Sequence, residues 1–157
     1  MPQIPDDRPS NIPWPPIIYA AALAAAWLLE SWLPLPALPE SLLVRWIGVV
    51  VFLGGLGLGL MGLMALRAAG TTFDPTGPAD ALATRGLYAR SRNPLYLAGV
   101  IALLGLSLAL RSTWLLVAVP AVAAALVKLA IEPEEAYLER RFGEAYRRYR
   151  ARVRRWI

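Results

Sequence analysis

Four long apolar runs, separated by polar segments, dominate this chain. They extend over about residues 16–33, 42–66, 94–110 and 113–131. A helix of about 20 residues crosses the roughly 30 Å apolar core of a bilayer, so each run is long enough, or nearly so, to span it. The sequence therefore predicts an all-α integral membrane protein with about four transmembrane helices and an amphipathic, interfacial C-terminal helix.

The composition limits the chemistry that such a protein can perform. Cysteine and histidine are both absent. Thiolate nucleophiles, imidazole bases and the usual transition-metal ligands are therefore excluded, and we expect no metal site. Carboxylates, phenols, guanidinium groups, amides and hydroxyls remain, but the sequence singles out no catalytic residue among them.

The positive charge of the chain indicates its orientation. The formal net charge is +5, and eight of the sixteen basic residues lie between Arg140 and Arg155. Four further arginines lie between the second and third apolar runs. The positive-inside rule then places both termini and the segment 67–93 of this multi-pass protein in the cytoplasm. A basic cluster beside apolar spans is typical of a lipid-facing surface, so we expect no nucleic-acid partner.

We expect one membrane domain over residues 1–157. Its parts are a cytoplasmic N-terminal segment (1–15), two spans (16–66), a functional loop (67–93), a hairpin of two spans (94–131) and an amphipathic helix (132–157). Ser41 and Ser112 suit the N-caps of the second and fourth spans. Proline suits a first helical turn, so we expect a bend at Glu132–Pro133 before the last helix begins.

A glycine pattern in the second run requires an interpretation. Residues 57–62 read GLGLMG, which matches the GxGxxG signature of dinucleotide-binding loops. That signature needs a preceding strand, whereas these glycines lie inside an apolar helix. We predict instead that small residues such as Gly55 and Gly59 let this helix approach another closely.

Two polar segments, 82–99 and 134–149, border the apolar runs on the same predicted side. Polar groups at the edge of a bilayer are a functional-site hypothesis by default. The segments contain LATRGLY at 82–88, SRNPLYLAG at 91–99, EE at 134–135 and FGEAYRRY at 142–149, and GTTFDP precedes them at 70–75. In order and spacing these pieces resemble the isoprenylcysteine carboxyl methyltransferase and phospholipid methyltransferase superfamily, in its small bacterial form.

The resemblance implies transfer of methyl from S-adenosylmethionine (SAM) to a hydrophobic or lipid-like acceptor that enters from the bilayer. It also implies a location in the bacterial cytoplasmic membrane. Carboxylates and tyrosines suit the ammonium, ribose and adenine of SAM, and Arg90 or Arg92 would meet its carboxylate or simply set topology. The cofactor-binding residues that the resemblance implies are Leu82, Ala83, Thr84, Tyr88, Arg92, Asn93, Pro94, Leu95, Tyr96, Glu134 and Glu135.

One departure from the resemblance concerns the acceptor. Relatives that methylate prenylcysteine carry an arginine four residues before the first glutamate of the pair, and Ala130 occupies that position here. Lys128 would point elsewhere on a helix, so a prenylcysteine acceptor is not expected. Two other functions stay open: an NADPH-dependent membrane reductase of related architecture, and a non-catalytic membrane protein whose last helix binds lipid or a partner. The sequence indicates no oligomeric state.

Overall fold

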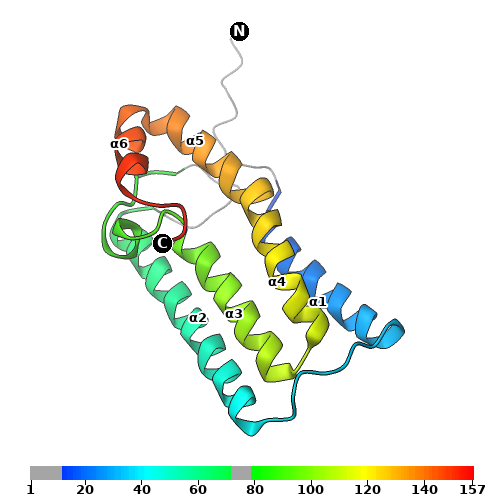
Figure 1. Cartoon of the computed structure of the whole chain (residues 1–157). Helices are drawn as coiled ribbons and strands as arrows, with labels where there is room; N and C mark the ends of the chain where they lie inside the picture. Colours follow the sequence, from blue (N-terminus) through cyan, green and yellow to red (C-terminus); the bar gives the residue numbers. More distant parts are fainter. Residues whose placement is uncertain (1–11, 72–78) are drawn as a thin grey trace.

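The computed structural model describes residues 12–71 and 79–157, and this part of the chain is helical, with loops between the helices. The long helices run alternately up and down, so the start of α1, the loop before α3 and the C-terminal helices lie at one end of the bundle (Figure 1). We call this end the polar end. The elements are α1 (Trp14–Trp32), α2 (Leu42–Ala68), η1 (Gly86–Ala89), α3 (Pro94–Leu110), α4 (Thr113–Leu126), η2 (Val127–Ile131), α5 (Glu132–Phe142) and α6 (Glu144–Arg152).

Both predicted N-caps are confirmed. The hydroxyl oxygen of Ser41 accepts a hydrogen bond from the Val44 amide at 3.4 Å, and that of Ser112 accepts one from the Leu115 amide at 3.0 Å. Each bond satisfies a backbone donor that has no partner inside its own helix. These caps fix the starts of α2 and α4.

Two helices are long and apolar enough to cross a membrane by length and composition. They are α2, with 27 residues, and the continuous helix Thr113–Phe142, with 30 residues, and each contains an 18-residue window with a mean hydropathy of 2.3. Only 17% and 28% of their apolar windows are buried, whereas a core helix of a soluble protein is mostly buried. α3 is a shorter apolar helix of 17 residues. Four spans, as expected from the sequence, are therefore not shown.

The expected bend at Glu132–Pro133 is wrong. The chain continues from α4 into α5 through the π turn η2, which ends two residues before Pro133. A proline inside a helix lacks the N–H donor, and its ring collides with the carbonyl four residues earlier. The wider π turn accommodates both effects, so the helix passes the proline without breaking.

The expected single helix over 132–157 is also wrong. Gly143 adopts φ 53° and ψ −122°, which ends α5 and starts α6. Glycine reaches positive φ at little cost, so it separates two helices at this point. α6 ends at Arg152, and Val153 is extended. We call residues 153–157 the tail.

The glycine-rich part of α2 packs closely against α3. A Cβ atom added to Gly55 would lie 2.6 Å from the backbone nitrogen of Ala102, whereas one added to Gly59 would make an ordinary 3.6 Å contact with Ala98. A Cβ atom at Gly57 would meet no heavy atom within 4 Å among the described residues. The glycines of the GxGxxG pattern thus face different sides of one helix, and the predicted packing role of Gly55 is confirmed.

We expect Gly55→Ala to lower the free energy of unfolding by about 1–3 kcal/mol, because the new methyl group must push two backbones apart. Gly54→Ala is the matched control, since a Cβ atom there meets nothing within 4 Å among the described residues. It should be neutral or slightly stabilising, because alanine favours a helix more than glycine does. Unfolding transitions in mild detergent measure both. Equal changes in the free energy of unfolding for Gly55→Ala and Gly54→Ala would contradict the close packing of α2 on α3.

Candidate functional site

The polar end is built around a contact between α3 and α5. The hydroxyl of Tyr96, in the first turn of α3, donates a hydrogen bond to Oε2 of Glu134 at 2.7 Å. Tyr19 of α1 donates to the backbone carbonyl of Tyr96 at 3.4 Å, which brings a third helix to the same point. Among the described residues, Glu134 forms no ion pair. Its carboxylate therefore retains capacity for a cation or for hydroxyl donors.

The adjacent carboxylate, Glu135, is neutralised by two arginines of the chain. Arg155 of the tail donates from Nε to Oε1 at 3.2 Å and from Nη2 to Oε2 at 2.8 Å, and Nη1 of Arg92 lies 3.3 Å from Oε1. The Glu135 side chain is only 8% exposed. Its hydrogen bonds also raise the pKa of Arg155. Glu134 and Glu135 therefore differ in their surroundings: Glu134 accepts from Tyr96 and forms no ion pair among the described residues, whereas Glu135 joins α5 to Arg92 and to the tail.

The tail also binds the segment that leads into α3. The Arg92 amide donates to the Arg154 carbonyl at 3.0 Å, and Nδ2 of Asn93 donates to the Arg155 carbonyl at 3.1 Å. The Ser91 hydroxyl lies 3.4 Å from the same Arg155 carbonyl. These three bonds explain why the tail is extended: its carbonyl groups pair with the loop rather than with a helix.

Buried tyrosines fix the loop against the C-terminal helices. Tyr149 of α6 donates to the Tyr88 carbonyl at 2.7 Å, and the Tyr137 hydroxyl of α5 accepts from the Ala79 amide at 2.9 Å. Burial raises the pKa of Tyr88 and Tyr149, and it raises that of Tyr146 to about 12. All three phenols therefore stay protonated at neutral pH and do not act as bases.

The structure brings most of the predicted cofactor residues to one place. Tyr96 contacts Glu134, and Arg92 contacts Glu135. Ala83 and Tyr88 are buried together, and Leu95 packs against them. Buried Pro94 opens α3, and Asn93 directs its amide group to the tail. Leu82 is half-buried and Thr84 is exposed in the loop before η1. No observation tests their cofactor role, which stays a prediction.

Some of the relevant residues fall outside these predictions. The sequence motifs did not indicate Tyr19 or Arg155, because both contacts depend on distant parts of the chain. Residues 72–75 of the GTTFDP motif lie outside the described residues. Within residues 12–71 and 79–157, no group of three or more acidic side chains is placed to hold a metal ion.

The position that carries arginine in prenylcysteine methyltransferases is apolar here. Ala130 is 7% exposed and belongs to the same buried cluster as Tyr96 and Leu126. Lys128 is exposed and donates to both carboxylate oxygens of Glu132, at 3.0 and 3.1 Å. The expectation that Lys128 points away from that position is confirmed.

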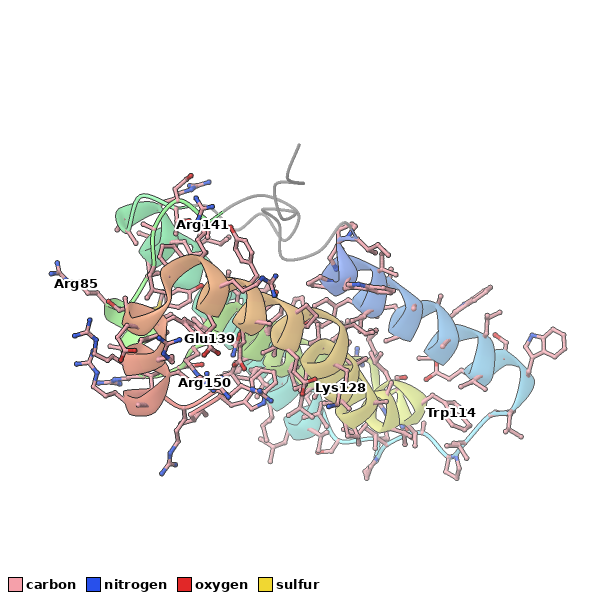
Figure 2. The ribbon with its side chains drawn as sticks, turned by 90° about the horizontal axis from the view of Figure 1, so that it is seen from above. Arg85, Trp114, Lys128, Glu139, Arg141 and Arg150 are labelled. Carbon is pink, nitrogen blue, oxygen red and sulfur yellow. The ribbon has the colours of Figure 1, made fainter. Side chains whose placement is uncertain are left out.

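The outer face of α5 and α6 is charged. Figure 2 shows Glu139 and Arg150 facing each other where the two helices meet, and Nη1 of Arg150 donates to Oε2 of Glu139 at 3.2 Å. Arg85 projects away from the body of the protein in the same view. Most of the arginines on this face are exposed.

Together, the fold and the site define a helical protein with outward-facing apolar helices and a polar, tyrosine-rich site at one end. The family model for phospholipid methyltransferases matches residues 43–145. The chain belongs to this family and carries its methyltransferase domain. The match runs from the start of α2 into α6, so α1 and the tail lie outside it. No curated protein matches the chain.

Proposed function

We propose that the protein is an integral-membrane methyltransferase that binds SAM at the polar end and methylates a hydrophobic, phospholipid-like acceptor. The observation that carries this proposal is the Tyr96–Glu134 contact. It presents a carboxylate without an ion pair at the junction of the two polar segments. SAM carries a sulfonium, an ammonium and a ribose diol, all of which suit a carboxylate.

The remaining residues fit the other parts of SAM. Tyr88 and Tyr96 offer apolar rings beside hydroxyl groups, and Leu82, Ala83 and Leu95 supply apolar surface for an adenine. When bound, SAM supplies a methyl group that leaves sulfur for a nucleophile in line with it. The chain contributes by orienting Glu134 through Tyr96 and by excluding water from a site in which Tyr96 is only 5% exposed.

We further propose that α1, α2, α3 and α4 all cross the membrane, with both termini and the polar end in the cytoplasm. The exposed arginines of α5 and α6 support this orientation, because basic residues favour the cytoplasmic side. SAM would then reach the site from the cytoplasm, while the acceptor enters from the bilayer.

The orientation can be tested with single cysteines, because the chain contains none. Arg85→Cys and Arg150→Cys, both at exposed positions of the polar end, should be shielded from an impermeant thiol reagent in intact cells and should react after permeabilisation. Glu40→Cys, at the opposite end, should react in intact cells. Labelling of Arg85→Cys and Arg150→Cys from opposite sides would rule out a single cytoplasmic site.

The buried Ala130 supports an acceptor without a carboxylate. A carboxylate that enters an apolar region without a cation is costly to desolvate. An amine-bearing lipid avoids this cost, because an amine can react in its uncharged form. We therefore propose an amine lipid or a small hydrophobic molecule as the acceptor.

Two measurements test the proposed activity. The purified protein, in detergent, should bind SAM and should not bind NADPH in calorimetric titrations. Incubation with methyl-labelled SAM and vesicles containing an amine lipid should then place label in the lipid fraction. Binding of NADPH without SAM would support a reductase, and binding of neither would support a non-catalytic membrane protein.

A further inference from the structure

A single residue of the tail joins the two halves of the candidate site. The guanidinium of Arg155 makes two hydrogen bonds to Glu135 of α5, while its backbone carbonyl accepts from Asn93. Glu135 is the direct neighbour of Glu134, and Asn93 is the N-cap of α3, three residues before Tyr96. Arg155 thus contacts both elements that present the Tyr96–Glu134 pair.

The surroundings hold the tail in this position. Trp156 packs against the apolar core, and the Arg154 carbonyl accepts from the Arg92 amide. The Arg155 side chain remains 32% exposed, whereas Glu135 is 8% exposed. Glu135 also keeps Arg92 as a second cation, so the fold does not depend on Arg155 to neutralise this carboxylate.

We propose that Arg155 is a positioning residue for the SAM site. It holds α5 and the start of α3 at the spacing that lets Tyr96 orient Glu134. This inference rests on the proposed function, because that function identifies SAM as the ligand of the site. It concerns a residue that lies outside the region matched by the family model.

The test compares Arg155→Met with Arg154→Met. The two substitutions remove the same charge from adjacent positions, but the Arg154 side chain is exposed, and among the described residues Arg154 contacts the loop through its backbone carbonyl alone. Arg155→Met should raise the dissociation constant for SAM about tenfold, the scale of one charge-assisted hydrogen bond. Arg154→Met should leave it unchanged. Arg155→Lys keeps the charge but loses the bidentate contact with Glu135, so its dissociation constant for SAM should lie between those of the unmodified protein and Arg155→Met.

Two further readouts separate positioning from general stabilisation. A residue that only stabilised the fold would lower the unfolding temperature of Arg155→Met and leave SAM affinity in the folded protein unchanged, which would overturn the proposal. Hydrogen exchange at the Arg92 amide should become faster in Arg155→Met and not in Arg154→Met, because the tail would detach from the loop. If the Arg92 amide of Arg155→Met stayed as protected from hydrogen exchange as in the unmodified protein, this result would also overturn the proposal.

Failure of the proposed function gives a different result. If the unmodified protein bound no SAM, the assignment of the ligand would be refuted, while the hydrogen exchange at Arg92 would still decide whether Arg155 joins the two elements. Faster exchange of the Arg92 amide in Arg155→Met would then support the role of Arg155 in joining α5 to the start of α3, whatever the ligand.

Discussion

Glu134→Gln is expected to remove most of the affinity for SAM while the protein stays folded. A hydrogen bond to a charged group contributes about 1.5–3 kcal/mol, so the dissociation constant should rise by a factor of about 10 to 150. The amide oxygen of glutamine can still accept from Tyr96, so the contact between α3 and α5 survives the substitution. Calorimetric titration of the purified variant with SAM measures the loss.

The appropriate control is Glu144→Gln. Glu144 is an exposed carboxylate whose only partner among the described residues is Arg147 on the surface of α6, so its removal should not alter SAM affinity. Tyr96→Phe should weaken binding less than Glu134→Gln does, because the carboxylate remains but loses its orienting donor. Unchanged affinity in both Glu134→Gln and Tyr96→Phe would show that SAM does not bind at this point.

Glu135→Ala should have the largest effect on stability. It leaves the guanidinium groups of Arg92 and Arg155 without their shared carboxylate, and Arg92 is only 10% exposed. Removing one partner of a buried ion pair costs about 3–5 kcal/mol. We expect the loss of stability in Glu135→Ala to lie near the lower limit of this range, because Arg155 is partly exposed and water can solvate its charge. Chemical unfolding in detergent measures the change.

A matched control and a rescue accompany this prediction. Glu139 also contacts two arginines, Arg147 and Arg150, but on the surface, so Glu139→Ala should cost about 0–1 kcal/mol. Adding Arg92→Met to Glu135→Ala removes the most buried unpaired cation and should recover part of the lost stability. Equal costs for Glu135→Ala and Glu139→Ala, or no recovery in the double variant, would contradict the role assigned to Glu135.

The features that were predictable from the sequence depend on neighbouring residues. Ser41 and Ser112 cap their helices because a hydroxyl reaches an amide three residues ahead, which is a local interaction. The packing role of Gly55 follows from its place in an apolar helix. The tyrosine and glutamate motifs also placed Tyr96 and Glu134 correctly at one end of the bundle, because the alternating direction of the helices follows from their number and loop lengths.

The features that were not predictable depend on long-range pairing. Arg155 belongs to a basic run whose pattern indicates topology and a lipid-facing surface. Its structural role depends on contacts with Glu135, 20 residues earlier, and with Asn93, 62 residues earlier. The break at Gly143 did have a local signal, since glycine commonly ends helices, but the recurring apolar residues from Leu138 to Trp156 masked it. The periodicity therefore suggested one helix where the structure has two helices and a tail.

The π turn at Val127–Ile131 sets the rotational phase of α5 relative to α4. A π turn holds about one residue more than an α turn, so every side chain beyond it is rotated by about 100° from its place on an uninterrupted helix. Although α4 and α5 form one continuous helix, the π turn thus determines the direction in which the carboxylates of α5 point relative to the apolar face of α4. Deleting one residue from this turn would swing Glu134 away from Tyr96 without altering a single side chain of the site.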